Sequence, residues 1–422
     1  MDIYAVIVPV LVLAAVVPTA LLGRWVARGL GQPAVVGEIA FSLLLGVVLV
    51  SQAGWGRPGS EGLGLLKDLG HFGLALFLVG AAHEIRGGAS RISGRAVAWL
   101  AAGSALLPLA AGGLLAVWVL NYGGAGLRGD APVPALVLML AISLAVTAVP
   151  VLAGILEDRG MDRTETGRLA MAGAVTIDAV TWIMLTVAIG LATGDNGYAG
   201  AAGVLAAGGI AVILLRRVAA GTTVRTWAGK RPLPTLLLVA LAAGAAATAT
   251  GRLGLTEVFG AVLVGLALPA DGDEGPFTRA AKKLGSIGRQ VLPLLFTVTG
   301  TTLVTGPDTE FSWQVMVLGI VLAIASKLVG TYLGARAGAQ DHIGSLRLAA
   351  LMNTRGLTEI VVLQTGYSAG ILTPGLYLAL VIMALVTTGL SGPLLWAIDR
   401  WPGAAPPHSP TRADPTPQPV ER

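Results

Sequence analysis

A single aspartate interrupts a long apolar stretch of this sequence. Asp178 lies in AVTIDAVTWIML and is the only charged residue between Arg168 and Asp195. A helix of about 25 residues is long enough to cross a bilayer. A carboxylate inside a bilayer costs roughly 3 kcal/mol or more, so such residues usually face a cavity on an ion or proton pathway. We therefore expect Asp178 to hold a transported ion or proton; the alternative is a structural acid paired with a neighbouring helix.

A second apolar stretch contains a proline that should break its helix. In LAISLAVTAVPVLAGIL, Pro150 has no N–H to donate to the carbonyl of Val146. A free carbonyl beside the Thr147 hydroxyl is a plausible ligand for a small hard cation. We expect Val146, Thr147, Thr176 and Asp178 to form the cation and proton site.

A third stretch, ALMNTRGLTEIVVL, places polar groups in another apolar segment. Asn353, Thr354 and Gly356 interrupt it, and Arg355 and Glu359 are the only charges between Arg347 and Asp399. Their i,i+4 spacing allows an ion pair on one helix face. Broken helices also expose terminal partial charges that need compensation inside a membrane. We expect Pro150, Asn353, Arg355 and Glu359 to belong to two interrupted helices that cross.

One lysine stands alone in VMVLGIVLAIASKLVGTYLGA. Lys327 is the only charged residue between Glu310 and Arg336. It could extend its ammonium group toward the cytoplasmic surface near Arg336. Because other isolated charges lie in the apolar segments, we prefer the interpretation that Lys327 compensates charge inside the membrane. We expect Lys327 to lean toward the C-terminal end of a broken helix, or toward Asp178 when no cation is bound.

The composition indicates the kind of protein that must position these groups. The chain has 422 residues, of which 55% are hydrophobic and 12% charged, and its mean hydropathy is +0.78. Soluble domains carry about 25% charged residues, so we expect an all-α polytopic membrane protein. The chain has no cysteine, which excludes disulfides and cysteine-ligated metals. The net charge of +5 requires no nucleic-acid partner, and we expect no cofactor.

The apolar segments number about thirteen by length and hydropathy. Basic residues cluster in alternate loops, which places the N-terminus outside and the C-terminus in the cytoplasm of a cell membrane. The Pro-rich residues 403–422 should form a disordered cytoplasmic tail after a transmembrane domain over 1–402. The segments lie near 3–23, 34–50, 64–83, 95–120, 133–156, 168–193, 198–215, 232–250, 254–270, 287–306, 313–335, 346–367 and 373–398.

The two halves of the chain resemble each other. EIAFSLLLGVVL begins at Glu38 and EVFGAVLVGLAL begins at Glu257, with glycines at the matching positions Gly46 and Gly265. The copies start at the second and ninth segments, and this odd shift of seven helices would invert one copy relative to the other. Inverted repeats of this kind are typical of secondary transporters, whose sites lie between the halves. We expect repeat one over about 3–193, a linker helix over about 198–215 and repeat two over about 232–398.

These motifs together resemble the monovalent cation:proton antiporters, in the branch of bacterial sodium/proton and potassium/proton exchangers. TAVPVLAGILEDRG and ALMNTRGLTEIVVL look like the two crossing helices of that family, SKLVGTYLGAR like its lysine helix and AVTIDAVTWIML like its aspartate helix. The resemblance implies a core domain with crossed helices, a panel domain that dimerises and an elevator-like cycle. Many relatives carry two adjacent acids before Trp182, and here the first of those positions is Ile177.

The leading hypothesis is a secondary antiporter that exchanges Na⁺ or K⁺ for H⁺ at Asp178. One carboxylate that holds either a proton or a cation couples the two fluxes, and with Ile177 in place of the first acid, exchange should be electroneutral. The alternative on the same fold is a sodium- or proton-coupled transporter of a small organic solute, which needs a larger polar cavity. We do not expect an enzyme, because His-rich metal clusters and paired catalytic aspartates are not evident. We do not expect a channel either. A homodimer is the expected assembly.

Overall fold

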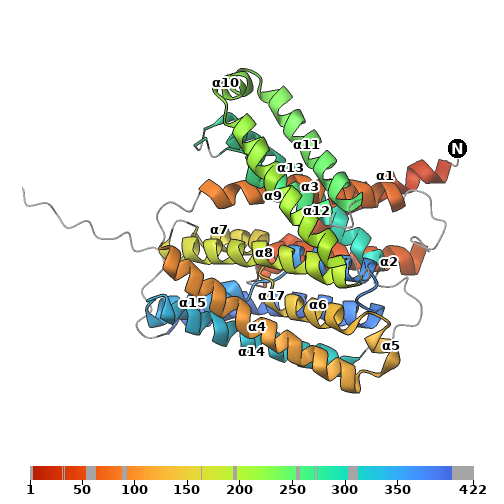
Figure 1. Cartoon of the computed structure of the whole chain (residues 1–422). Coiled ribbons are helices and arrows are strands. Elements are labelled where there is room, and N and C mark those ends of the chain that lie inside the picture. The colour runs from red at the N-terminus through yellow and green to blue at the C-terminus, as the bar shows by residue number, and fades with distance from the viewer. Residues whose placement is uncertain are drawn as a thin grey trace, which may run out of the picture.

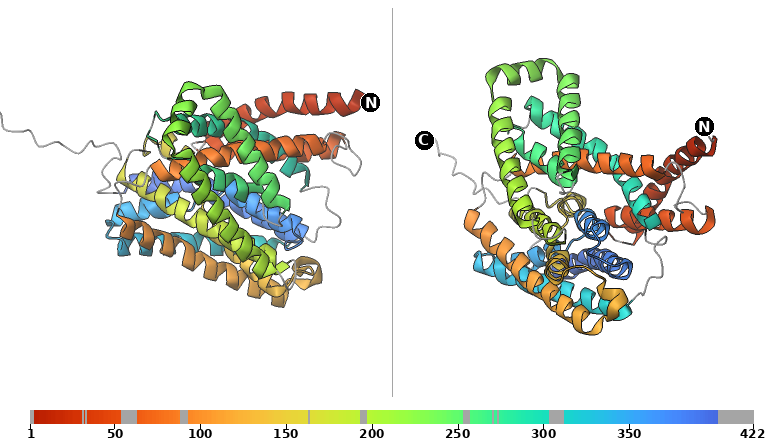
Figure 2. Two further views of the ribbon diagram at one scale, coloured as in Figure 1. Left: turned by 45° about the horizontal axis from the view of Figure 1, so that its top comes forward. Right: turned by 45° about the vertical axis from the view of Figure 1, so that its right-hand side comes forward.

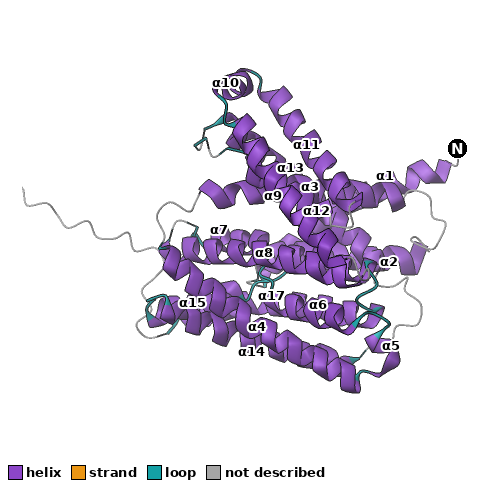
Figure 3. Ribbon diagram, viewed as in Figure 1, coloured by secondary structure: helices purple, strands orange, loops and turns teal. Residues whose placement is uncertain are grey.

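The computed structural model describes residues 3–30, 32, 34–53, 63–87, 93–162, 164–192, 197–252, 257–269, 271–272, 274–302 and 312–401. The predicted tail 403–422 lies outside them. Within these ranges every regular element is an α-helix (Figure 3). The helices are α1 Ile3–Gly29, α2 Ala34–Ala53, α3 Leu63–Gly87, α4 Gly94–Tyr122, α5 Gly124–Arg128, α6 Val133–Ala145, α7 Val149–Asp158, α8 Glu165–Ala192, α9 Gly197–Ala219, α10 Thr222–Lys230, α11 Pro232–Arg252, α12 Glu257–Ala267, α13 Pro276–Thr302, α14 Trp313–Ala337, α15 His342–Met352, α16 Leu357–Ser368 and α17 Pro374–Asp399.

The helices form two packed groups (Figure 1). In the first, α4 packs on α14 and α6, and α14 packs in turn on α15 and α17. In the second, α3 packs on α13 and α12, and α2 packs on α13 and α1. We call the first group, together with α7, α8 and α16, the core bundle. It comprises α4, α6, α7, α8 and α14–α17. We call the second group, together with α11, the panel bundle, which comprises α1–α3 and α11–α13. Helix α10 joins the ends of α9 and α11, which project together from the rest of the molecule (Figure 2).

Each predicted apolar segment coincides with helix in this structure. The segments near 133–156 and 346–367 are each split into two helices, and α5 and α10 are additional short helices. Among the described residues, eight helices are long and apolar enough to cross a membrane. The chain is therefore a multi-pass membrane protein by length and composition of its helices, while a count of thirteen spans stays a prediction.

Helix α13 begins earlier than predicted, at Pro276 and not near 287. The carboxylate of Asp271 accepts hydrogen bonds from the backbone N–H groups of Phe277 (3.1 Å) and Thr278 (3.3 Å), which caps the helix. The first turns carry Lys282, Lys283 and other polar residues. A hydropathy pattern misses such an amphipathic start, because the cap and not the apolar content defines it.

The two glycines that suggested the repeats make equivalent contacts. A Cβ atom on Gly46 of α2 would lie 2.0 Å from the Thr297 carbonyl oxygen of α13, and one on Gly265 of α12 would lie 2.6 Å from the Val79 carbonyl oxygen of α3. Each glycine thus permits close packing against a helix of the other predicted repeat. This reciprocal contact supports the repeat arrangement, although its boundaries remain a prediction.

Candidate ion-binding site

Two interrupted helices cross at the centre of the core bundle. The chain is extended at Val146–Ala148, between α6 and α7, and Asn353–Gly356 separate α15 from α16. The Ala148 N–H donates to the Thr354 carbonyl oxygen (3.1 Å), and the Thr147 hydroxyl donates to the Met352 carbonyl oxygen (3.2 Å). The two breaks therefore satisfy part of each other's backbone, as the predicted crossing requires.

Pro150 belongs to an interrupted helix, as expected, but the break lies just before it. The chain has already left the helix at Val146, whose φ and ψ are −55° and 144°. Pro150 is in the first turn of α7, where a missing N–H costs no helical hydrogen bond. The extended residues, and not a kink at the proline, separate the two half-helices.

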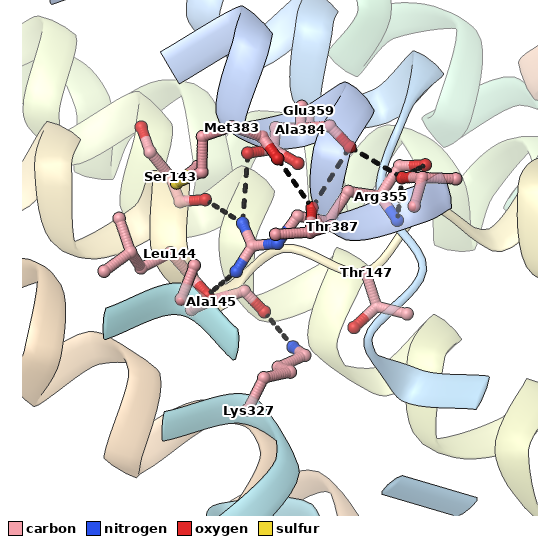
Figure 4. A network of polar contacts seen from close by, with 12 residues as sticks. Ser143, Leu144, Ala145, Thr147, Lys327, Arg355, Glu359, Met383, Ala384 and Thr387 are labelled. Atoms are coloured by element: carbon pink, nitrogen blue, oxygen red, sulfur yellow. Dashed lines mark hydrogen bonds and ion pairs between the residues drawn. The ribbon is translucent and has the colours of Figure 1, made fainter. Parts of the chain in front are cut away.

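Two buried cations cap the C-terminal end of α6. Arg355 donates from Nη1 to the Ser143 carbonyl oxygen and from Nη2 to the Leu144 carbonyl oxygen, while Lys327 Nζ donates to the Ala145 carbonyl oxygen (Figure 4). These three carbonyls have lost their helical partners because the helix stops. Positive side chains also oppose the partial negative charge at this helix end. Lys327 thus bonds to the end of a broken helix, and its role in charge compensation stays a prediction.

Lys327 has a second partner that another helix break supplies. Its Nζ donates to the Ser104 carbonyl oxygen of α4 (3.0 Å). Pro108 stands four residues later in α4 and has no N–H for that carbonyl. Because Lys327 is fully buried (0% exposed) and bonds to these carbonyls, its ammonium group does not reach for the membrane surface.

The predicted pair of Arg355 and Glu359 is present. Arg355 Nη1 lies 3.0 Å from Glu359 Oε1, and both side chains are fully buried. Helix α17 holds this break in place, because Thr388 Oγ1 accepts the Arg355 backbone N–H (2.9 Å) and Asn353 Nδ2 donates to the Thr387 carbonyl oxygen (3.0 Å). The positive charge of Arg355 is thus shared between a carboxylate and the α6 end.

Asp178 lies on a small cavity of about 70 Å³ beside the crossing. Its lining includes Val149 and Thr358, from the first turns of α7 and α16, so two half-helix N-termini face the same space. Their partial positive charges favour a carboxylate there. Asp178 and Thr358 are the two lining residues with polar side chains; the others, besides Val149, are Leu78, Ala81, Ala82, Val175, Ala179, Trp182, Val262 and Leu266.

The structure does not bring all the predicted ligands to this cavity. Val146 and Thr147 are fully buried in the break and do not line it. Thr176 is exposed, and its hydroxyl donates to the Ala172 carbonyl oxygen (2.8 Å), so it faces away from the site. Thr358 was missed. Its position in the polar motif, next to Glu359, was the one sequence signal that could have marked it.

Two further cavities share lining residues in series with the Asp178 cavity. A cavity of about 230 Å³ shares Ala81 and Val149 with the Asp178 cavity and is lined by Lys282 and Arg289. A third, of about 260 Å³, shares Arg289 with the second and also borders Arg24 and Arg28 of α1. The three cavities are lined by both core and panel helices, and the third also borders the acidic residues Glu38, Glu157 and Asp158.

Comparison with known proteins supplies the family. A family model described as sodium/hydrogen exchanger, transmembrane, matches residues 17–398. The chain belongs to this family. As a sodium/hydrogen exchanger family member, it is similar in fold to the sodium proton antiporter MjNhaP1 from Methanocaldococcus jannaschii, with a TM-score of 0.62 at 16% identity over 93% of this chain and 97% of that one.

Individual exchanger relatives extend this comparison. The chain is 30% identical over 401 residues to Cation/H⁺ antiporter 20 of Arabidopsis thaliana, covering 88% of this chain and 46% of that one. It is 26% identical over 381 residues to the Na⁺/H⁺-K⁺ antiporter GerN of Bacillus cereus, covering 87% of this chain and 90% of that one. The chain spans about half the length of the plant relatives it matches.

Proposed function

We propose that this protein is a secondary antiporter that exchanges a monovalent cation, Na⁺ or K⁺, for protons at Asp178. The observation that carries the proposal is the placement of this carboxylate on a small cavity, next to the N-termini of two crossed half-helices. A carboxyl group in such a low-dielectric site is stable either with a proton or with a cation. Competition between the two at one group couples their fluxes.

The size of the cavity supports an inorganic ion. Sites for organic ligands occupy about 300–1,000 Å³, whereas the Asp178 cavity measures about 70 Å³ and is lined almost entirely by apolar side chains. That space suits a cation with a few waters and does not favour an organic solute. The relatives carry the same suggestion in their names, as cation/H⁺ and Na⁺/H⁺-K⁺ antiporters.

Basic residues near the site support one orientation in the membrane. Arg24, Arg28, Lys282 and Arg289 line the two neighbouring cavities, and basic residues concentrate on the cytoplasmic side of membrane proteins. We infer that this conformation admits ions from the cytoplasm of a cell membrane, with the N-terminus outside. The exposed apolar face of α11, which includes Leu233, Leu237 and Leu241, leaves room for a homodimer through the panel bundle or for lipid.

The test is transport by purified protein in proteoliposomes with a preset pH gradient and an internal pH dye. A pulse of Na⁺ or K⁺ should collapse the gradient with the wild type and not with Asp178→Asn, which keeps the shape but removes the exchangeable charge. Asp68→Asn, at an exposed position of α3, is the matched control and should exchange normally. Normal exchange by Asp178→Asn would show that the carboxylate is not the shared site.

A further inference from the structure

Thr358 carries a hydroxyl that finds no hydrogen-bond partner among the described residues. Its side chain is 3% exposed and its Oγ1 is buried. A helical threonine usually bonds to a carbonyl three or four residues back, as Thr365 of the same helix does with the Val361 carbonyl oxygen (2.8 Å). A buried hydroxyl without such a bond requires an explanation.

The local backbone explains why the hydroxyl of Thr358 is left over. The two carbonyls it could reach belong to Thr354 and Arg355, in the break before α16. The Thr354 oxygen accepts the Ala148 N–H (3.1 Å), and the Arg355 oxygen accepts the Thr388 hydroxyl (2.7 Å). Contacts with Ala148, before α7, and with Thr388 of α17 thus already engage both carbonyls. The Thr358 hydroxyl keeps no partner in the described part of the protein, and Thr358 lines the same cavity as Asp178.

We propose that Thr358 is a ligand of the transported cation and helps to set which cation the site accepts. This inference rests on the proposed function. A hydroxyl oxygen can turn a lone pair to a cation. Since α16 holds the residue in its first turn, its oxygen replaces one water of the ion's shell at a fixed place. The benefit of a fixed ligand depends on the radius of the ion.

The experiment compares three variants by cation-driven proton flux in proteoliposomes, with Na⁺ and K⁺ titrated separately. Thr358→Val removes the hydroxyl at similar volume, and Thr358→Ser keeps it. Thr365→Val, whose hydroxyl has an ordinary helical partner, is the matched control. We expect Thr358→Val to raise the apparent KM for the preferred cation roughly tenfold, the usual size for loss of one polar contact to a charge. Its maximal rate should change less, and its ratio of KM values for Na⁺ and K⁺ should shift.

Thr358→Ser should restore KM and selectivity to within about twofold of the wild type, and Thr365→Val should leave both unchanged. An unaltered KM and selectivity in Thr358→Val would overturn the inference. Equal changes in Thr358→Ser would overturn it too, because the effect would then come from packing and not from the hydroxyl. If the wild type drives no cation-dependent proton flux, the proposed function itself fails. Exchange by the wild type with an unaltered Thr358→Val rejects the role of Thr358 alone.

Discussion

The buried charge of Lys327 satisfies backbone carbonyl groups that have lost their helical partners. Its ammonium group bonds to the carbonyl oxygens of Ala145 and Ser104, each freed by a helix interruption. Lys327→Met keeps the length of the side chain but leaves both oxygens buried without a donor, at about 1–3 kcal/mol each. We expect a clearly lower melting temperature in detergent solution. Lys67→Met, at an exposed position of α3, should melt like the wild type. Equal melting of the two variants would contradict this role.

Arg355 and Glu359 should contribute unequally to stability. Arg355→Met leaves the Glu359 carboxylate unpaired in the interior and removes donors from the Ser143 and Leu144 carbonyls. Breaking a buried pair in this way costs roughly 3–5 kcal/mol. Glu359→Gln retains an oxygen that can accept from Arg355, so we expect a smaller loss. Thermal unfolding of the two single variants and of the double variant measures the order, and a Glu359→Gln variant as unstable as Arg355→Met would show that the carboxylate charge dominates.

At the scale of elements, the crossing depends on Gly356 more than on Pro150. Gly356 has a φ of 148°, and a Cβ atom there would lie 2.7 Å from Val151 Cγ2 of the other broken helix. Strained backbone of this kind costs about 1–3 kcal/mol, so Gly356→Ala should lower both melting temperature and exchange rate. Pro150→Ala should change exchange little, because the break lies before it. Gly209→Ala, with open space around its Cα, is the control; a harmless Gly356→Ala would refute the argument.

The sequence predicted the elements and the charged groups well, for a physical reason. A lone charge in an apolar helix is energetically costly, so Asp178, Lys327 and the pair Arg355–Glu359 can be recognised as functional candidates from the sequence. Neutral Thr358 gives no such signal, because its lack of a partner depends on tertiary hydrogen bonds to the nearby backbone carbonyls. Pro150 marked the first break, but the sequence did not predict that Val146–Ala148 are extended, because contacts with residues some two hundred positions away hold them so. Such tertiary bonds leave no local pattern.

At the scale of the whole molecule, the site lies where the two bundles meet. Asp178, Val149 and Thr358 belong to the core bundle, whereas Leu78, Ala81, Ala82, Val262 and Leu266 come from α3 and α12 of the panel bundle. The panel contributes only apolar side chains to this cavity. Movement of the core along the panel would therefore expose Asp178 to the other side without breaking the hydrogen bonds of the crossing. That property suits the elevator-like cycle that the resemblance implies.

The charge balance of the core predicts electroneutral exchange. Ile177 is a buried apolar residue next to Asp178, and Lys327 bonds to backbone carbonyls in place of a second acid. Arg355 and Glu359 already form a pair. One carboxylate then alternates between one proton and one monovalent cation, so no net charge crosses the membrane in a full cycle. We expect the exchange rate in proteoliposomes to stay constant when a potassium–valinomycin potential is imposed during Na⁺ exchange.

The matched comparison introduces the missing acid. Ile177→Asp introduces the acid that the resemblance implies for this position, and a second titratable group next to Asp178 would allow a second proton to move. In this variant the rate should depend on the imposed potential, and solid-supported-membrane recordings should show currents that the wild type lacks. If the variant does not fold, the wild-type measurement alone still decides. A steep dependence of wild-type exchange on potential, or wild-type currents that vanish in Asp178→Asn, would rule out one-for-one exchange and require a second charged carrier such as Lys327 or Glu359.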